Sequence, residues 1–291
     1  MKKLLKLLLL GMLTISSKAD WITFDIENDI IFDRDYYYTN GFRFTYETDN
    51  MWSYMFGQNM YTPQNKWVKV PDKGDRPYNG WLYMGVGKTI QKDSWEQYYE
   101  LCLGATGHAS FADRTQTLVH EWLDNHVPEG WNSQPPSEFA VCLYGRESYS
   151  LLDCPYFNAI PYIDGSLGNI TTFIGGGLKL ELGYNVERSI HSQIPIKNDV
   201  NITKTKPIRA FLFASAGGRY VVNNIFLEGN TFKDYEYAVD IEHWVADFEL
   251  GLGLQYNNVK LYIIEDLRTR EYTTQDECIK GFGGVKLMIG F

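Results

Sequence analysis

Hydrophobic and polar residues alternate with a period of two along most of this chain. Within Glu242–Tyr256, alternate residues from Trp244 to Tyr256 are all apolar, while the residues between them are polar or glycine, except for Val245. Thr171–Tyr184, Gly41–Glu47 and the C-terminal residues repeat the pattern. Successive side chains of a strand point to opposite faces, so this pattern predicts strands with one apolar face and one polar or small face.

Twelve such strands are predicted. Their ranges are Trp21–Ile30, Gly41–Asp49, Tyr54–Tyr61, Gly80–Ile90, Glu96–Ala105, Glu138–Tyr149, Tyr156–Ile163, Ile170–Val186, Ile208–Val222, Val239–Tyr256, Asn258–Arg268 and Lys280–Phe291. An even number of antiparallel strands closes a barrel with both chain ends on one side, the periplasmic side of a bacterial outer membrane.

A soluble β-sandwich would also alternate, but three details favour a transmembrane barrel. Aromatic residues gather at the strand ends, as in the aromatic girdles of membrane barrels. The polar faces are rich in glycine, which suits curvature and a filled lumen. The last strand ends on Phe291, which resembles the assembly signal of bacterial outer-membrane proteins. The predicted fold class is therefore all-β, a twelve-stranded antiparallel transmembrane β-barrel with a short helix in an outer loop.

The connections between these strands alternate in length, as a membrane barrel requires. The predicted outer loops are Ile31–Asn40, Thr62–Asn79, Thr106–Ser137, Asp164–Asn169, Asn223–Ala238 and Thr269–Ile279. Glu187–Pro207 is long although it falls on the predicted periplasmic side. It is either an ordered periplasmic flap or a sign that the strand count slips there.

The N-terminus has the pattern of an export signal. Residues 1–19 combine three early lysines, the apolar run Leu7–Ile15 and the small-x-small sequence Ser17-Lys18-Ala19. The alternative is an amphipathic helix of the mature protein. We expect a signal peptide over 1–19 and a single barrel domain over 20–291.

Charge and composition narrow the functional classes. The formal net charge is −9, and removal of residues 1–19, which hold four lysines and no acid, makes it −13. The chain has no basic stripe, so we expect no nucleic-acid partner. Four cysteines are too few for a disulfide-built scaffold. Cys102 and Cys142 lie on successive predicted strands, and their pairing is left open.

Ala112–Asn125, within the longest outer loop, breaks the alternation. Its apolar residues Leu118, Val119, Trp122 and Leu123 recur at helical spacing. Gln116 and His120 are four residues apart and therefore project from one face of the helix. A structured loop of about thirty residues is commonly functional.

Strand direction brings further polar residues to the same rim. Asn28 and Asp29 lie at the outer end of the first strand, and Thr39 lies where the second begins. Together with Gln116 and His120, they supply a carboxylate, amides, a hydroxyl and an imidazole, which can serve as base, metal ligand and oxyanion donor. Taken alone, His120 is more simply a surface histidine of a loop helix.

At these residues the sequence resembles the lipid A 3′-O-deacylase (LpxR) family of outer-membrane enzymes. The resemblance covers nearly all of the mature chain, and it depends on the order and spacing of short segments. These segments are Glu27-Asn28-Asp29, Tyr38-Thr39-Asn40-Gly41, Gln58-Asn59-Met60-Tyr61-Thr62-Pro63, Gly74-Asp75-Arg76-Pro77-Tyr78, Ala112-Asp113 through Gln116 to His120, Gly130-Trp131 with Gln134, and Leu227-Glu228-Gly229-Asn230-Thr231-Phe232.

The resemblance implies a calcium-dependent hydrolase that removes the 3′ acyloxyacyl chain of lipid A, the anchor of lipopolysaccharide in the outer leaflet. His120 would activate water with Gln116 beside it, and Thr39 would hydrogen-bond within the site. Asn28 and Asp29 would position the Ca²⁺ ion, which prefers such oxygen ligands. We expect a monomer in the outer membrane. The sequence departs from the family pattern at His126, where an acidic residue can stand.

The same residues allow other interpretations of the function. Lys66 and Arg76 could meet substrate phosphates or be solvated loop charges. The protein could be an outer-membrane phospholipase with a serine nucleophile, although no serine stands in an activated context beside His120. It could also be a non-enzymatic small barrel, as a pore or an adhesin scaffold, which would leave the helix and the polar rim without a role.

Overall fold

A computed structural model describes residues 20–28, 37–186 and 208–291. The predicted signal peptide 1–19 and the segment Glu187–Pro207 lie outside the described residues, as does Asp29.

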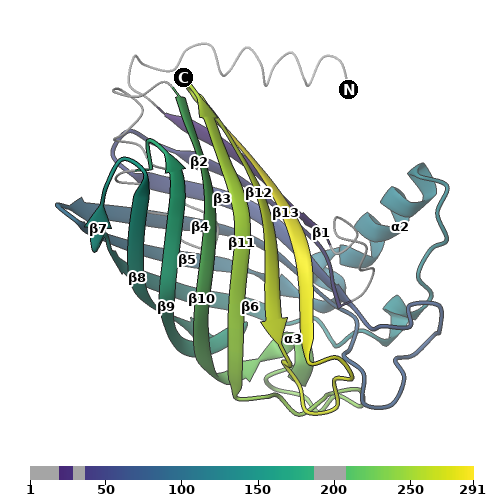
Figure 1. The fold of residues 1–291 in the computed structure, drawn as a ribbon. Helices are drawn as coiled ribbons and strands as arrows, with labels where there is room; N and C mark the ends of the chain where they lie inside the picture. Colours follow the sequence, from purple (N-terminus) through teal and green to yellow (C-terminus); the bar gives the residue numbers. More distant parts are fainter. Residues whose placement is uncertain (1–19, 29–36, 187–207) are drawn as a thin grey trace.

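Twelve long antiparallel strands form one closed sheet (Figure 1). They are β1 (Trp21–Asn28), β2 (Tyr37–Glu47), β3 (Trp52–Thr62), β4 (Asn79–Lys92), β5 (Trp95–Thr106), β6 (Phe139–Tyr149), β8 (Phe157–Gly168), β9 (Thr171–Tyr184), β10 (Ile208–Asn224), β11 (Trp244–Tyr256), β12 (Val259–Thr269) and β13 (Ile279–Gly290). The two-residue strand β7 (Leu152–Asp153) pairs only with β8. Pairing of β6 with β8 and of β1 with β13 closes the barrel, so the predicted fold class and the count of twelve are confirmed.

Exposure alternates along the strands as the sequence pattern requires. On β3, Tyr54 and Phe56 are exposed, whereas Ser53 and Met55 are buried in the lumen. The outward face is apolar in the middle of the wall, where Met84 is 65% exposed, and aromatic at both ends, with Trp52 at one end and Phe139 at the other. An apolar exterior band between aromatic girdles is the surface that a bilayer covers.

The lumen contains paired charges. Arg43 lies 2.6 Å from Glu100, Lys179 lies 3.1 Å from Glu249, and Lys286 lies 2.8 Å from Asp25. All six side chains are buried, and a buried charge is tolerated when it is paired and hydrogen-bonded. These contacts cross-link strands that are far apart in the chain.

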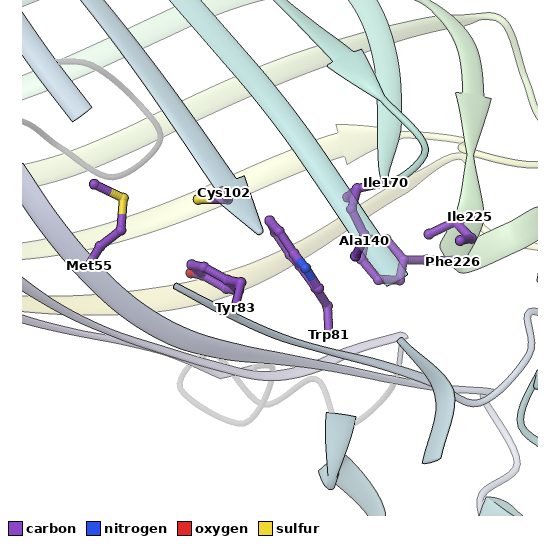
Figure 2. Packing of buried hydrophobic residues seen from close by; sticks show 8 residues of the cluster. All are labelled: Met55, Trp81, Tyr83, Cys102, Ala140, Ile170, Ile225 and Phe226. Atoms are coloured by element: carbon purple, nitrogen blue, oxygen red, sulfur yellow. The ribbon is translucent and has the colours of Figure 1, made fainter. Parts of the chain in front are cut away.

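A short helix, α3 (Ile225–Glu228), seals the outer end of the lumen. Its residues Ile225 and Phe226 are buried against Trp81, Ala140 and Ile170 (Figure 2). The Phe226 ring stacks on Tyr61 with centroids 4.2 Å apart, and Asn79 donates its side-chain amide to the Ile225 carbonyl. Aromatic side chains therefore cross the barrel mouth beneath α3.

Several element boundaries differ from the prediction. β2 begins four residues earlier than predicted, at Tyr37, and β11 begins five residues later, at Trp244. β8 continues to Gly168, which shortens the predicted loop Asp164–Asn169 to a tight turn. There Gly168 adopts a φ of 147°, and a Cβ would lie 2.1 Å from the Val141 carbonyl oxygen. Because β9 and β10 pair in register on either side of Glu187–Pro207, the strand count does not slip.

The predicted loop helix is α2 (Ala112–Trp122), preceded by the 3₁₀ turn η3 (Gly107–Ser110) and followed by η4 (Gly130–Ser133). It ends three residues earlier than predicted, and α3 is an additional helix. None of the helices in the described ranges is long and apolar enough to cross a membrane. Cys102 lies opposite Cys142 in the β5–β6 register, and the cysteines are unbonded.

Candidate functional site

The loop that contains α2 packs against the outer surface of the barrel wall. Gly80 at the start of β4 has no side chain, and a Cβ there would lie 2.3 Å from both the Ala112 Cβ and the Ser110 Oγ. Gln58 on β3 donates Nε2 to the Ser110 carbonyl over 2.6 Å. Gly80 and Gln58 share strand parity with the exposed Met84 and Phe56, so they face away from the lumen. The start of α2 therefore covers the outside of β3 and β4.

Asn28 belongs to the same outward face. It shares strand parity with the exposed Phe24 and Ile26. The register aligns Asn28 with Asn40 on β2, then with Met60 on β3 and Gly80 on β4. Polar side chains thus interrupt the apolar exterior at the outer ends of β1 and β2, next to the place where α2 begins.

Thr39 is fixed at this edge by a bulge in β2. The β2–β3 register shifts between Tyr38 and Asn40, which leaves Thr39 as the extra residue. Its Oγ1 lies 2.6 Å from Thr62 Oγ1, and its carbonyl accepts Asn28 Nδ2 over 2.9 Å. Both threonines are buried. The structure therefore brings the predicted residues Asn28 and Thr39 into direct contact, whereas Asp29 lies outside the described residues.

Gln116 is buried on the wall side of α2. Its Oε1 accepts the Trp131 indole N–H over 2.6 Å. Because an indole can only donate, this bond assigns the orientation of the amide and leaves Nε2 as a donor. Nε2 is buried and has no hydrogen-bond partner among the described residues. Trp131 itself packs with Met60, Tyr78 and Ala112.

His120 lies one turn after Gln116 on the same face of α2. Its Nδ1 lies 2.6 Å from the carbonyl oxygen of His126. A carbonyl only accepts, so Nδ1 carries a proton in this contact and the neutral ring has its lone pair on Nε2. Position 126, where the sequence departs from the family pattern, thus orients His120 through its main chain.

Lys66 and Arg76 are both buried, so they are not solvated loop charges. The Arg76 guanidinium lies 4.6 Å from the centre of the Tyr61 ring and 3.8 Å from the Glu271 carboxylate. Burial raises the pKa of the neighbouring Asp75 carboxyl above its ordinary value. Arg76 is therefore part of the contact between two outer loops.

The donors available for a metal ion here are oxygen atoms. Among the described residues, no group of three or more His, Cys, Asp or Glu side chains is arranged to hold a metal ion. Asn28 contributes an amide, and its Nδ2 is directed toward the Thr39 carbonyl. Oxygen ligands of this kind fit Ca²⁺ better than a thiolate-preferring metal.

Sequence reasoning missed three contributors: Thr62, the indole of Trp131 and the main chain of His126. Thr62 could have been recognised from the sequence, because it is a polar residue at the strand parity of Tyr54 and Phe56, which face outward. The other two depend on how the loop after α2 folds back on the helix.

The space inside the barrel is separate from this site. A lumenal cavity of about 230 Å³ is lined by Glu27, Tyr38, Arg43 and other inward residues, and by none of Asn28, Thr39, Gln116 and His120. The polar site thus lies between α2 and the exterior of the wall.

The solved structure of LpxR from Salmonella typhimurium is similar to this chain, with a TM-score of 0.82 and 19% sequence identity, covering 93% of this chain and 100% of that one. The β domain of the Bordetella autotransporter BrkA is less similar, with a TM-score of 0.45 and 9% identity over 95% of this chain and 99% of its own. No curated protein sequence matches the chain.

The family model described as outer membrane protein LpxR matches residues 4–291. That match spans nearly the entire sequence, including every strand of the barrel and the loop that holds α2. The chain therefore belongs to the LpxR family of outer membrane proteins.

Proposed function

We propose that this protein is a calcium-dependent hydrolase that cleaves the 3′-O-linked acyloxyacyl chain of lipid A. The observation that supports this proposal most directly is a polar site on the bilayer-facing side of the barrel wall. It lies at the outer ends of β1–β4 and beside α2. The ester linkages of an outer-leaflet lipid lie near this level, so the substrate can reach the site without entering the lumen. Family membership supports the same assignment.

His120 is suited to act as the general base. Its Nδ1 proton is held by the His126 carbonyl, so Nε2 can accept a proton from water. The water oxygen attacks the ester carbonyl carbon, the bond to the 3′ sugar oxygen breaks, and that oxygen takes the proton from Nε2. The products are a carboxylic acid and the sugar alcohol, and the imidazole returns to its neutral form.

Neighbouring residues and a bound calcium ion would assist this step. Gln116, one turn before His120, has a buried Nε2 with no partner among the described residues, and this donor would bind the attacking water or the substrate. Asn28, with Asp29, would hold the calcium ion, and Thr39 would position Asn28 through its carbonyl. When bound, calcium would supply positive charge to the oxyanion that develops on the ester carbonyl.

The phospholipase alternative with a serine nucleophile receives no support at this site. Ser110, at the base of α2, is buried and donates Oγ to the Gly107 carbonyl over 2.6 Å. This bond gives Ser110 a structural role in η3.

The test is mass spectrometry of lipid A from cells that express the full chain or its variants. Wild-type protein should remove the 3′ acyloxyacyl chain, and His120→Ala should lower that activity by about 10²–10⁴-fold, the range for loss of a general base. His243→Ala is a matched control, because His243 also directs Nδ1 to a carbonyl, that of Val221, but lies outside the site. Unchanged lipid A in cells with wild-type protein and ample calcium would refute the proposed reaction.

Calcium is tested separately with purified protein and lipid A in detergent. A calcium chelator should abolish hydrolysis, and added Ca²⁺ should restore it while Mg²⁺ should not, because Mg²⁺ demands stricter octahedral geometry. Full activity in the chelator would remove calcium from the mechanism while leaving the hydrolase assignment in place.

A further inference from the structure

The apolar side of α2 is not covered by the protein. Leu118 is 68% exposed and Trp122 is 82% exposed, and Val119 and the C-cap residue Leu123 are exposed as well. An amphipathic helix of a globular domain buries this stripe. Here Ala112 and Gln116 are the buried residues of α2, so the helix contacts the wall at its start and along one narrow edge.

Residue positions divide the helix into two opposite sides. At 3.6 residues per turn, Leu118, Val119 and Trp122 fall within one sector. The opposite sector holds the polar residues Asp113, Thr117, His120 and Glu121. Gln116 and Arg114 lie on the two boundaries between these sides. This division into an apolar and a polar side is typical of an amphipathic helix that lies in a membrane interface.

The location of α2 agrees with this division. Its first turn is packed on the outward face of β3 and β4, and Figure 1 shows the rest of the helix projecting sideways from the barrel. The exposed apolar exterior continues up to this point, because Leu103 pairs with Met84 and the 66%-exposed Phe139 stands opposite Ala105, shortly before η3. The apolar side of α2 thus adjoins the band that the bilayer covers.

We propose that the apolar side of α2, formed by Leu118, Val119, Trp122 and Leu123, lies in the acyl-chain boundary of the outer leaflet. Arg114 and Glu121 then face the headgroups and water. Tryptophan is enriched at such interfaces, which fits Trp122 at the projecting end. The barrel wall and α2 would bound the site on two sides, and the bilayer would bound it on a third. A lipid would then approach His120 laterally along the helix. This proposal goes beyond the hydrolase assignment and concerns where α2 sits.

The test places nitroxide labels on α2 of the full chain, folded into dilauroylphosphatidylcholine vesicles that contain no lipid A. Single cysteines at Trp122→Cys and Glu121→Cys form a matched pair of neighbouring positions, about 100° apart around the helix, one on its apolar side and one on its polar side. The four native cysteines are replaced by serine. Leu143→Cys, on the exterior of β6, is the reference for lipid contact. Collisions with oxygen, which partitions into lipid, and with a water-soluble nickel chelate are measured by electron paramagnetic resonance.

The label at 122 should match the lipid reference, with an oxygen-to-nickel collision ratio several-fold above that at 121. Equal ratios at 121 and 122 would overturn the proposal. Concentration-dependent spin–spin broadening at 122 would also overturn it, because a second copy of the chain would then cover the helix. A heat-modifiable gel shift confirms that each variant is folded. Since no lipid A is used, failure here leaves the hydrolase proposal untouched.

Discussion

At the residue scale, the site combines side chains from distant parts of the chain through a few directional bonds. The indole of Trp131 fixes Gln116, and the carbonyl of Thr39 fixes Asn28. Each of these bonds fixes the orientation of the amide that it holds. Partners of this kind commonly change activity by about 10–100-fold when they are removed from a metal or catalytic site.

The main-chain contact of His120 leads to a specific expectation for its neighbour. His126→Ala keeps the carbonyl that accepts from Nδ1, so lipid A hydrolysis should remain within about twofold of wild type, whereas loss of a general base costs about 10²–10⁴-fold. The measurement is the initial rate of 3′ chain release by purified protein in detergent. A loss as large as that of His120→Ala would show that the His126 side chain takes part.

At the element scale, alternation predicts most of the strands, and the departures have physical causes. The first residues of β2 are polar on the outward face because they belong to the site, so they resemble a loop. Val239 is apolar but packs with Leu227 and Tyr272 beneath an outer loop, which moves the start of β11 to Trp244. The stripe on α2 predicted a helix correctly, whereas its exposure follows from tertiary packing that no local pattern encodes.

The candidate site shows the same limit. Strand direction and helical spacing were sufficient to place Asn28, Thr39, Gln116 and His120 at one rim. They did not indicate that the site lies outside the wall. This location depends on the absence of a side chain at Gly80, which lets α2 approach, and on the fold of residues 123–134.

Two outer loops, residues 63–78 and 270–278, are joined by contacts with a defined pH dependence. Tyr272 donates to Asp75 over 2.9 Å, and Glu271 lies between Arg76 and Arg268. Burial acts to raise the pKa of Glu271, but the two arginines outweigh it and hold this pKa below its ordinary value of 4.5. A lowered carboxyl pKa stabilises the folded state above the unfolded pKa, and this contribution is lost as the pH falls through the folded pKa.

Glu271→Gln should therefore expose these loops at pH 7 and have little effect in acid. Hydrogen exchange of peptides from the two loops should be about fivefold faster in the variant at pH 7, corresponding to roughly 1 kcal/mol. The difference should shrink as the pH falls from 4.5 toward the lower folded pKa of Glu271, where the wild-type carboxyl becomes protonated as well. Comparing the two proteins at each pH cancels the intrinsic exchange rate and the titration of Asp75. A difference that persists or grows in acid would contradict the assignment.

At the scale of the whole molecule, the barrel is a scaffold with a closed interior. Paired charges such as Arg43 with Glu100 line the lumen, and α3 with its aromatic neighbours covers the outer mouth. The strands thus present an inner face with buried ion pairs and an outer face that meets lipid. The proposed chemistry would take place on the flank where α2 leaves the wall.

A closed interior predicts the absence of a pore. Purified protein in a planar bilayer should give no stable conductance steps, and proteoliposomes that contain it should not swell in solutions of small sugars. A general porin at the same protein-to-lipid ratio is the positive control. Reproducible steps from the wild-type protein would revive the interpretation as a small pore.

The bond from His120 to the main chain of residue 126 also bears on how this protein can change over evolutionary time. Every amino acid brings a carbonyl to that position, so mutations at 126 can accumulate without moving the proton on the imidazole. A lineage could lose an acidic side chain there and keep the same base. Orthologues that lack an acidic side chain at this position should then still be functional.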